Sequence, residues 1–152
     1  GCYGVSVARW IMGQEPTHLQ AQAIYHSQGV DVQMIGTLRF ADDALAVIEA
    51  SFISALQQTF TVVGSRAVIE LPHNAFIPFE NEAVFTLRER DEEDGQIYTL
   101  PGADEYQLMV EHFADSVLTG KPLLWPVEDS IANLIVLDGL AQAAKTGQTV
   151  RL

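Results

Sequence analysis

One residue near the start of the chain, Tyr3, has a side chain that could take part in chemistry. A phenol loses its proton with an unperturbed pKa near ~10, so a neighbouring cation would have to lower that pKa before it could act as a base near neutral pH. The alternative is structural, with Tyr3 in the first turn of an amphipathic helix and its ring in the core. Taken by itself, the pattern favours this structural interpretation.

The histidines do not have the spacing of metal ligands. His18, His26, His73 and His112 form no His-x-x-x-His pair, and the only cysteine is Cys2. We therefore predict no metal site.

His73 lies in segment 72–76, which has the composition of a loop. Loops carry function more often than buried elements do, so His73 is a candidate for substrate binding. An exposed loop histidine without a role is the simpler interpretation. The acidic run at 89–94 is interpreted as a solvated hairpin tip, because its spacing does not fit a calcium loop.

Nucleotide-binding fingerprints are missing from the sequence. It contains neither Gly-x-Gly-x-x-Gly after a strand nor a phosphate-binding Gly-x-x-x-x-Gly-Lys-Ser/Thr loop, and Gly120-Lys121-Pro122 fits a connection between two helices. Ser6 and Ser130 lack the motif of a hydrolase nucleophile. We therefore expect no cofactor-binding residues in this chain.

Charge and composition exclude several classes of partner. The 152 residues carry a formal net charge of −12, which disfavours binding to nucleic acid or to anionic membranes. The 48% hydrophobic content is typical of a globular domain, and no apolar run reaches the ~20 residues of a membrane-spanning helix. A single cysteine fits a reducing compartment, so a cytoplasmic location is expected.

Hydrophobic periodicity predicts an α+β fold. Residues 3–12 form a helix with Tyr3, Val7, Trp10 and Ile11 on one face. Antiparallel hairpins follow, with strands expected at 19–26, 30–40, 44–53, 60–63, 67–71, 84–90 and 96–100. Helices are expected at 104–118 and 127–146, and a last strand at 150–152. The prediction is one large, mainly antiparallel sheet with helices on one face, in a single domain covering 1–152.

The other face of this sheet has a mixed pattern that suits either solvent or a partner sheet. Which face packs on the helices is not settled by the alternation, and we favour a symmetric partner sheet over solvent.

Motifs along nearly the whole chain resemble the C-terminal domain of the Gfo/Idh/MocA oxidoreductase family. These are Gly1-Cys2-Tyr3 with Ala8-Arg9-Trp10 and Gly13-Gln14-Glu15-Pro16, the hairpin at 60–69, the helix ending in Gly120-Lys121-Pro122, and the closing segment 143–150. No single motif is decisive, but their order and spacing together are fairly specific. The resemblance implies a fold of the glyceraldehyde-3-phosphate dehydrogenase C-terminal type.

The resemblance also implies roles for residues. Tyr3 stands where many members have a histidine, as in the branch similar to glucose–fructose oxidoreductase and dihydrodiol dehydrogenase, where the phenol is the proposed proton donor or acceptor. Arg9 is implied as a support of the substrate pocket or of an interdomain contact. The Asp and Lys that accompany this site in the family lie outside the chain.

At the scale of the whole protein, the resemblance implies an NAD(P)-dependent oxidoreductase that acts on a sugar, polyol or related secondary alcohol. NAD or NADP would be bound mainly by an N-terminal Rossmann domain, and the sheet would form a homo-oligomer, dimer or tetramer. The isolated chain is expected to be inactive. Two alternatives stay open: a free-standing, non-catalytic interaction module, and a family member whose site has decayed. The start of the chain, which lies within a helical pattern, argues against the first.

Overall fold

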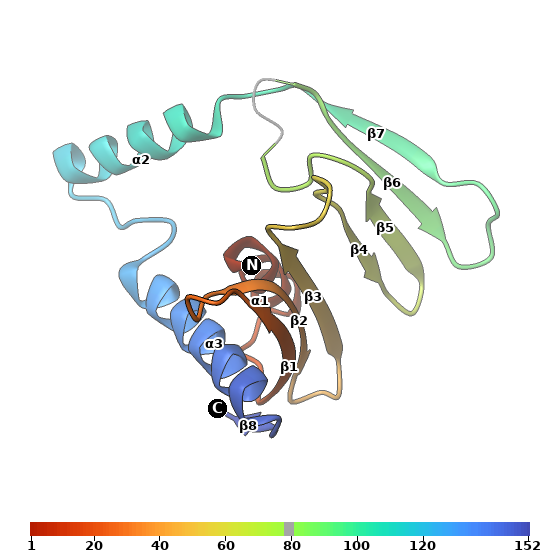
Figure 1. Cartoon of the computed structure of the whole chain (residues 1–152). Helices are drawn as coiled ribbons and strands as arrows, with labels where there is room; N and C mark the ends of the chain where they lie inside the picture. Colours follow the sequence, from red (N-terminus) through yellow and green to blue (C-terminus); the bar gives the residue numbers. More distant parts are fainter. Residues whose placement is uncertain (78–80) are drawn as a thin grey trace. The chain divides into compact units, whose positions relative to one another are not determined.

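The computed structural model describes residues 1–77 and 81–152, and the chain divides into two compact units (Figure 1). Unit 1 consists of Gly1–Ser54 and Leu124–Leu152, and unit 2 of Ala55–Leu123. That residues 1–152 act as one domain stays a prediction.

Unit 1 is built from helices α1 (Cys2–Met12) and α3 (Val127–Thr146) and strands β1 (His18–Tyr25), β2 (Asp31–Arg39), β3 (Leu45–Ser51) and β8 (Val150–Arg151). The strands form an antiparallel sheet in the order β3-β2-β1-β8, which we call sheet A. Glycines in the left-handed conformation end both helices: Gly13 has a φ of 63° and Gly147 a φ of 67°. A glycine tolerates this conformation without steric cost, so the helix ends could be predicted from the sequence.

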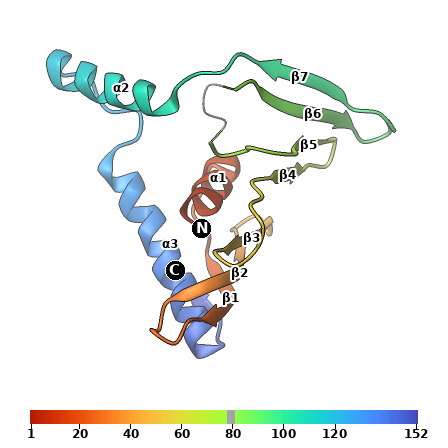
Figure 2. The same ribbon diagram turned by 45° about the horizontal axis from the view of Figure 1, so that its top comes forward.

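One face of sheet A is covered by α1 and α3 (Figures 1 and 2). The core between these layers contains Val5, Leu19, Leu38, Phe40, Val136 and Leu140, each at most 1% exposed. Gly36 and Gly139 allow the layers to approach closely. A Cβ at Gly36 would lie 2.8 Å from Cδ2 of Leu140, and one at Gly139 would lie 2.5 Å from Cδ1 of Leu19.

The opposite face of sheet A, here called the outer face, carries the residues that alternate with the core positions. Because Leu19, Gly36 and Leu38 face the helices, Gln20, Ile35 and Thr37 face away from them. The structure thus decides which face packs on the helices, a question that the sequence left open.

Unit 2 contains strands β4 (Phe60–Val63), β5 (Ala67–Leu71), β6 (Ala83–Glu89) and β7 (Gln96–Leu100) and helix α2 (Glu105–Thr119). The strands form a second antiparallel sheet in chain order, with the rings of Phe85 and Tyr98 stacked at 4.9 Å. The Asp104 side chain caps α2 by accepting bonds from the backbone N–H groups of Tyr106 and Gln107. Ser116 is the one residue of α2 in the buried class.

The predicted α+β class and its antiparallel hairpins are confirmed, with a difference in how the strands assemble. The eight strands form two four-stranded sheets rather than one large sheet. The break falls between β3 and β4, where residues 52–59 form no strand. None of the described helices is long and apolar enough to cross a membrane.

Candidate functional site

The first turn of α1 presents Tyr3. This turn packs on β3: a Cβ at Gly4 would be in van der Waals contact with Cγ2 of Ile48 at 3.4 Å, and one at Gly1 with Cβ of Ala50 at 3.6 Å. Tyr3 itself is 50% exposed. The helix is therefore fixed against the sheet while its tyrosine remains open to a reactant.

Periodicity placed Tyr3, Trp10 and Ile11 on one apolar face of α1, and in the structure these three side chains are exposed. Trp10 is 64% exposed and Ile11 37%, whereas Val5, Ala8 and Arg9 are buried. Small side chains and glycines let α1 lie close to the sheet, which leaves its largest aromatic residues outside. The interpretation of Tyr3 as a core aromatic is therefore wrong.

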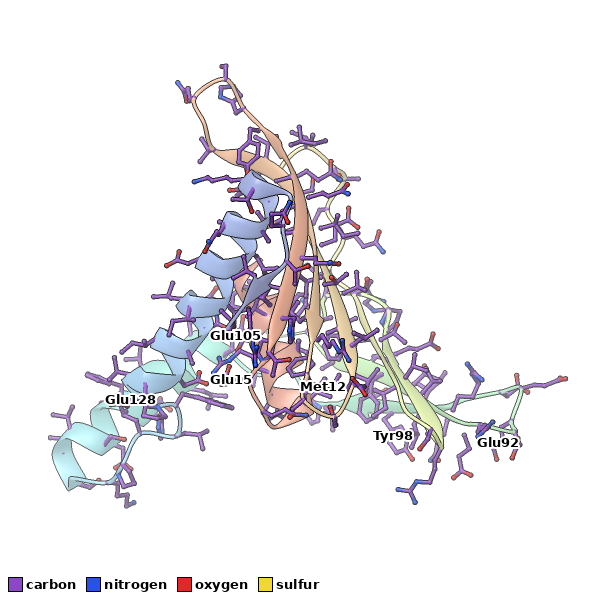
Figure 3. All side chains as sticks on the ribbon, turned by 90° about the horizontal axis from the view of Figure 1, so that it is seen from below. Met12, Glu15, Glu92, Tyr98, Glu105 and Glu128 are labelled. Atoms are coloured by element: carbon purple, nitrogen blue, oxygen red, sulfur yellow. The ribbon has the colours of Figure 1, made fainter. Side chains whose placement is uncertain are left out.

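Arg9 is buried at the other end of α1, with a side chain 7% exposed. Its Nε donates to Oε2 of Glu15 at 2.7 Å, and its Nη2 donates to Oε1 of Glu15 at 2.8 Å and to Oδ1 of Asp129 at 2.9 Å. This fork of donors joins the end of α1 to the first turn of α3, two segments 120 residues apart. Figure 3 labels Glu15, and also Glu128, the neighbour of Asp129.

The Arg9 pairing changes the proton affinity of both partners. The two hydrogen bonds from Arg9 hold the pKa of the Glu15 carboxyl below its usual value, and burial only partly opposes them. The hydrogen bonds to Glu15 likewise raise the pKa of Arg9, against desolvation. Both groups therefore stay charged across the neutral range.

Asn133 of α3 connects this network to the turn that carries Tyr3. Its Oδ1 accepts a bond from Nη1 of Arg9 at 3.4 Å, and its Nδ2 donates to the backbone carbonyl of Cys2 at 3.4 Å. Sequence reasoning missed these partners of Arg9. Asp129 and Asn133 lie more than 100 residues away, and Glu15, six residues on, lies beyond the end of the helix, where helical spacing predicts no contact.

The three predicted site residues fall in two units, Tyr3 and Arg9 in unit 1 and His73 in unit 2. Tyr3 and Arg9 share α1 but lie on different faces, one exposed and one buried. His73 is exposed in the loop after β5 and belongs to unit 2. Among residues 1–77 and 81–152, no group of three or more His, Cys, Asp or Glu side chains could hold a metal ion.

The outer face of sheet A contains two shallow hollows. One of about 510 Å³ is lined by Gln20, Gln22, Ile35 and Gln148 among others, and one of about 270 Å³ by His18, Thr37, Arg39 and Leu45 among others. Neither is lined by Tyr3. Their linings contain polar as well as apolar side chains, unlike the core.

Comparison with solved structures finds the same architecture within parts of longer chains. The chain superposes on a 3-ketoreductase from Actinomadura kijaniata, solved with NADP and TDP-benzene, with a TM-score of 0.84 at 19% identity, covering 93% of this chain and 43% of that one. For an aldose–aldose oxidoreductase from Caulobacter crescentus the TM-score is 0.80 at 20% identity, covering 100% and 46%. These likenesses show the fold.

Sequence comparison confirms the family resemblance. Residues 1–70 match the model of the GFO/IDH/MocA C-terminal domain. The D-xylose 1-dehydrogenase (NADP(+)) 2 of Haloferax volcanii is 29% identical over 154 aligned residues, which cover 100% of this chain and 46% of the relative. The chain thus spans about half the length of the curated relative that it matches.

Proposed function

We propose that this chain is the C-terminal, substrate-side half of an NAD(P)-dependent oxidoreductase that acts on a sugar, polyol or related secondary alcohol. The observation that carries the proposal is the alignment with a D-xylose dehydrogenase over the whole chain. The half-exposed Tyr3, on a turn anchored to the sheet, supplies a group suited to this chemistry.

The proposed role of Tyr3 is to move the proton of the substrate hydroxyl. Oxidation of a secondary alcohol removes a hydride from carbon and a proton from oxygen, and the phenolic oxygen of Tyr3 would accept that proton, or donate it in the reverse direction. NAD(P), when bound, would supply the hydride acceptor. Deprotonation of Tyr3 requires a nearby cation to stabilise the phenolate, which we place in the N-terminal half of the protein.

For the cofactor we propose NADP, because the relative aligned over the whole chain is named for that nucleotide. We place the binding residues in an N-terminal Rossmann domain rather than in this chain, whose sequence has no phosphate-binding fingerprint.

For Arg9 we propose an indirect role in place of direct substrate contact. Its guanidinium is buried and engaged with Glu15 and Asp129, so it supports the helix that carries Tyr3. His73 remains a candidate for substrate binding on its exposed loop.

Two surfaces of unit 1 suit the proposed partners. The exposed apolar side of α3, with Ile131, Leu134 and Ile135 each more than half exposed, suits burial against the N-terminal domain. The outer face of sheet A suits a second copy of the chain, which would make the protein a homo-oligomer. A cytoplasmic location is proposed from the single cysteine.

The test is an activity assay on the full-length protein that carries this chain, beside the 152-residue chain alone. Nicotinamide reduction would be followed at 340 nm, a standard absorbance, with NAD or NADP and a panel of aldoses and polyols. We expect turnover by the full-length protein with NADP and an aldose, and none by the chain alone. Turnover by the chain alone would contradict the proposal, as would a full-length protein inactive on every substrate of the panel.

A further inference from the structure

Asn133 of α3 bonds to α1 at two places. Its amide oxygen Oδ1 accepts a bond from Nη1 of Arg9 at 3.4 Å, and its amide nitrogen Nδ2 donates to the backbone carbonyl of Cys2 at 3.4 Å. All three residues belong to unit 1, in which α3 contacts α1. One side chain of α3 therefore connects the buried guanidinium of α1 with the first turn of that helix.

The carbonyl that Asn133 contacts belongs to the same peptide unit as the backbone N–H of Tyr3. A peptide unit is planar, and its plane contains the Cα atoms of both residues that it joins. A bond to the carbonyl of Cys2 therefore restrains the orientation of the peptide from which the Tyr3 side chain projects.

The first turn of α1 has few polar restraints of its own. Gly1, at the N-cap, has no side chain to accept a bond from the turn, and the turn contains no acidic residue. Gly1 and Gly4 are also weak helix formers. Within the turn, the N–H of Val5 donates to the carbonyl of Gly1 at 3.2 Å. The bond from Asn133 thus adds a restraint that the turn does not supply for itself.

The orientation of the Asn133 amide is set by its two partners. The guanidinium of Arg9 has only donors and so faces Oδ1, whereas the carbonyl of Cys2 has only acceptor sites and so faces Nδ2. Arg9 is itself held by Glu15 at 2.7 Å and by Asp129 at 2.9 Å. The amide is therefore oriented by a buried arginine whose own position is fixed.

We propose that Asn133 is a positioning residue for Tyr3, which holds the peptide that carries the phenol in the orientation needed for proton transfer. This inference rests on the proton-transfer role proposed above for Tyr3. Both bonds of Asn133 are longer than the usual ~2.9 Å, so they contribute little to folding. Their effect falls on alignment, to which a reaction rate is far more sensitive.

The test is Asn133→Asp in the full-length protein. This variant keeps the size of the side chain and an oxygen towards Arg9, but it replaces the Nδ2 donor by an oxygen that the carbonyl of Cys2 repels. With the aldose found by the substrate panel, we expect kcat to fall roughly tenfold and the KM for NADP to stay within about twofold. The thermal midpoint should stay close to wild type. Asn133→Leu, which removes both bonds, should lower kcat in the same way.

A double variant shows whether Asn133 acts through Tyr3. A residue that only positions the phenol has nothing left to position once the phenol is removed, so Asn133→Asp should cause no further loss of kcat in a Tyr3→Phe background. The control is Gln142→Glu, which makes the same amide-to-carboxylate change at an exposed position of α3 and should keep wild-type kcat.

Hydrogen exchange measures the restraint without reference to activity. We expect the backbone amides of α1 to exchange faster in full-length Asn133→Asp than in wild type, with the exchange of β1 and β2 unchanged. Mass spectrometry of the peptides that cover residues 1–12 measures this difference. Unchanged protection of α1 would show that Asn133 does not restrain the turn, and would overturn the inference.

The kinetic outcomes separate this inference from the proposed function. Wild-type kcat in Asn133→Asp, beside a slow Tyr3→Phe, would contradict the positioning role and leave the proposed function standing. Losses that multiply in the double variant would also overturn the inference, because Asn133 would then act independently of the phenol. Full turnover by Tyr3→Phe would instead remove the proposed role of Tyr3, and the positioning role with it.

Discussion

At the scale of single residues, α1 separates a structural arginine from an exposed tyrosine. Helical periodicity alone favoured a tyrosine ring in the core, whereas the family resemblance implied a catalytic Tyr3 and an Arg9 that supports the substrate pocket or an interdomain contact. Periodicity locates side chains around a helix without saying which side meets the sheet. That choice becomes visible only in the folded unit, where Val5 and Ala8 join the core.

Loss of the Arg9 side chain should destabilise unit 1. We expect Arg9→Met to lower the free energy of unfolding by about 1.5–3 kcal/mol, the range for hydrogen bonds to charged groups. The lower part of the range is expected because Glu15, at 56% exposed, and Asp129, at 29%, can regain water. Urea unfolding monitored by circular dichroism measures the loss.

The matched control is Arg39→Met, which breaks an ion pair whose partners are 57% and 77% exposed. Surface pairs contribute about 0–1 kcal/mol, so this variant should stay close to wild type. Equal losses for the two arginines would contradict a structural role specific to Arg9.

Lowering the pH should remove the stability that the Arg9–Glu15 pair contributes, because Glu15 becomes protonated. The pKa of Glu15 is lowered in the folded state, so its contribution is fully present above the ordinary value of 4.5 and is lost as pH falls through the folded value. The thermal midpoint of wild type should therefore exceed that of Glu15→Gln at pH 7, and the two should converge below pH 4.5. A constant gap between the two proteins across that range would show that the Glu15 charge contributes nothing.

At the scale of elements, helix and strand boundaries could be predicted well because their signals are local. Gly13, Gly120 and Gly147 end the three helices in the left-handed conformation, and four elements, including β4 and α3, have the predicted bounds. The buried side of α3 was harder to predict, since apolar residues surround the helix. Packing against sheet A and α1 selects Val136, Gly139, Leu140 and Ala143 as its buried side.

A pair of leucines on α3 tests which side forms the core. Leu140 is 0% exposed and contacts the Gly36 position, whereas Leu134 is 58% exposed. We expect Leu140→Ala to cost about 2–5 kcal/mol of folding free energy. Leu134→Ala in the isolated chain should lower the folding free energy by much less than Leu140→Ala does. Similar losses for the two variants in urea unfolding would contradict the described core.

At the scale of the whole molecule, local patterns predicted the strands but not how they divide between sheets. Apart from the pairing of β1 with β8, each described pairing joins strands that are consecutive in the chain, as expected for hairpins. Whether β3 and β4 also pair depends on residues 52–59, whose composition does not decide the question. The net charge of −12 likewise does not reveal that strand register places His18, Arg39 and Arg151 side by side on β1, β2 and β8.

The central claim is that Tyr3 moves the substrate proton, and substitution by phenylalanine in the full-length protein tests it most directly. Tyr106→Phe is the control, because that phenol is 49% exposed and Tyr3 is 50% exposed. The account predicts that Tyr3→Phe lowers kcat by roughly 10²–10⁴-fold, the usual contribution of a general acid or base, with little change in thermal midpoint. Tyr106→Phe should keep wild-type kcat. Full turnover by Tyr3→Phe would contradict the account.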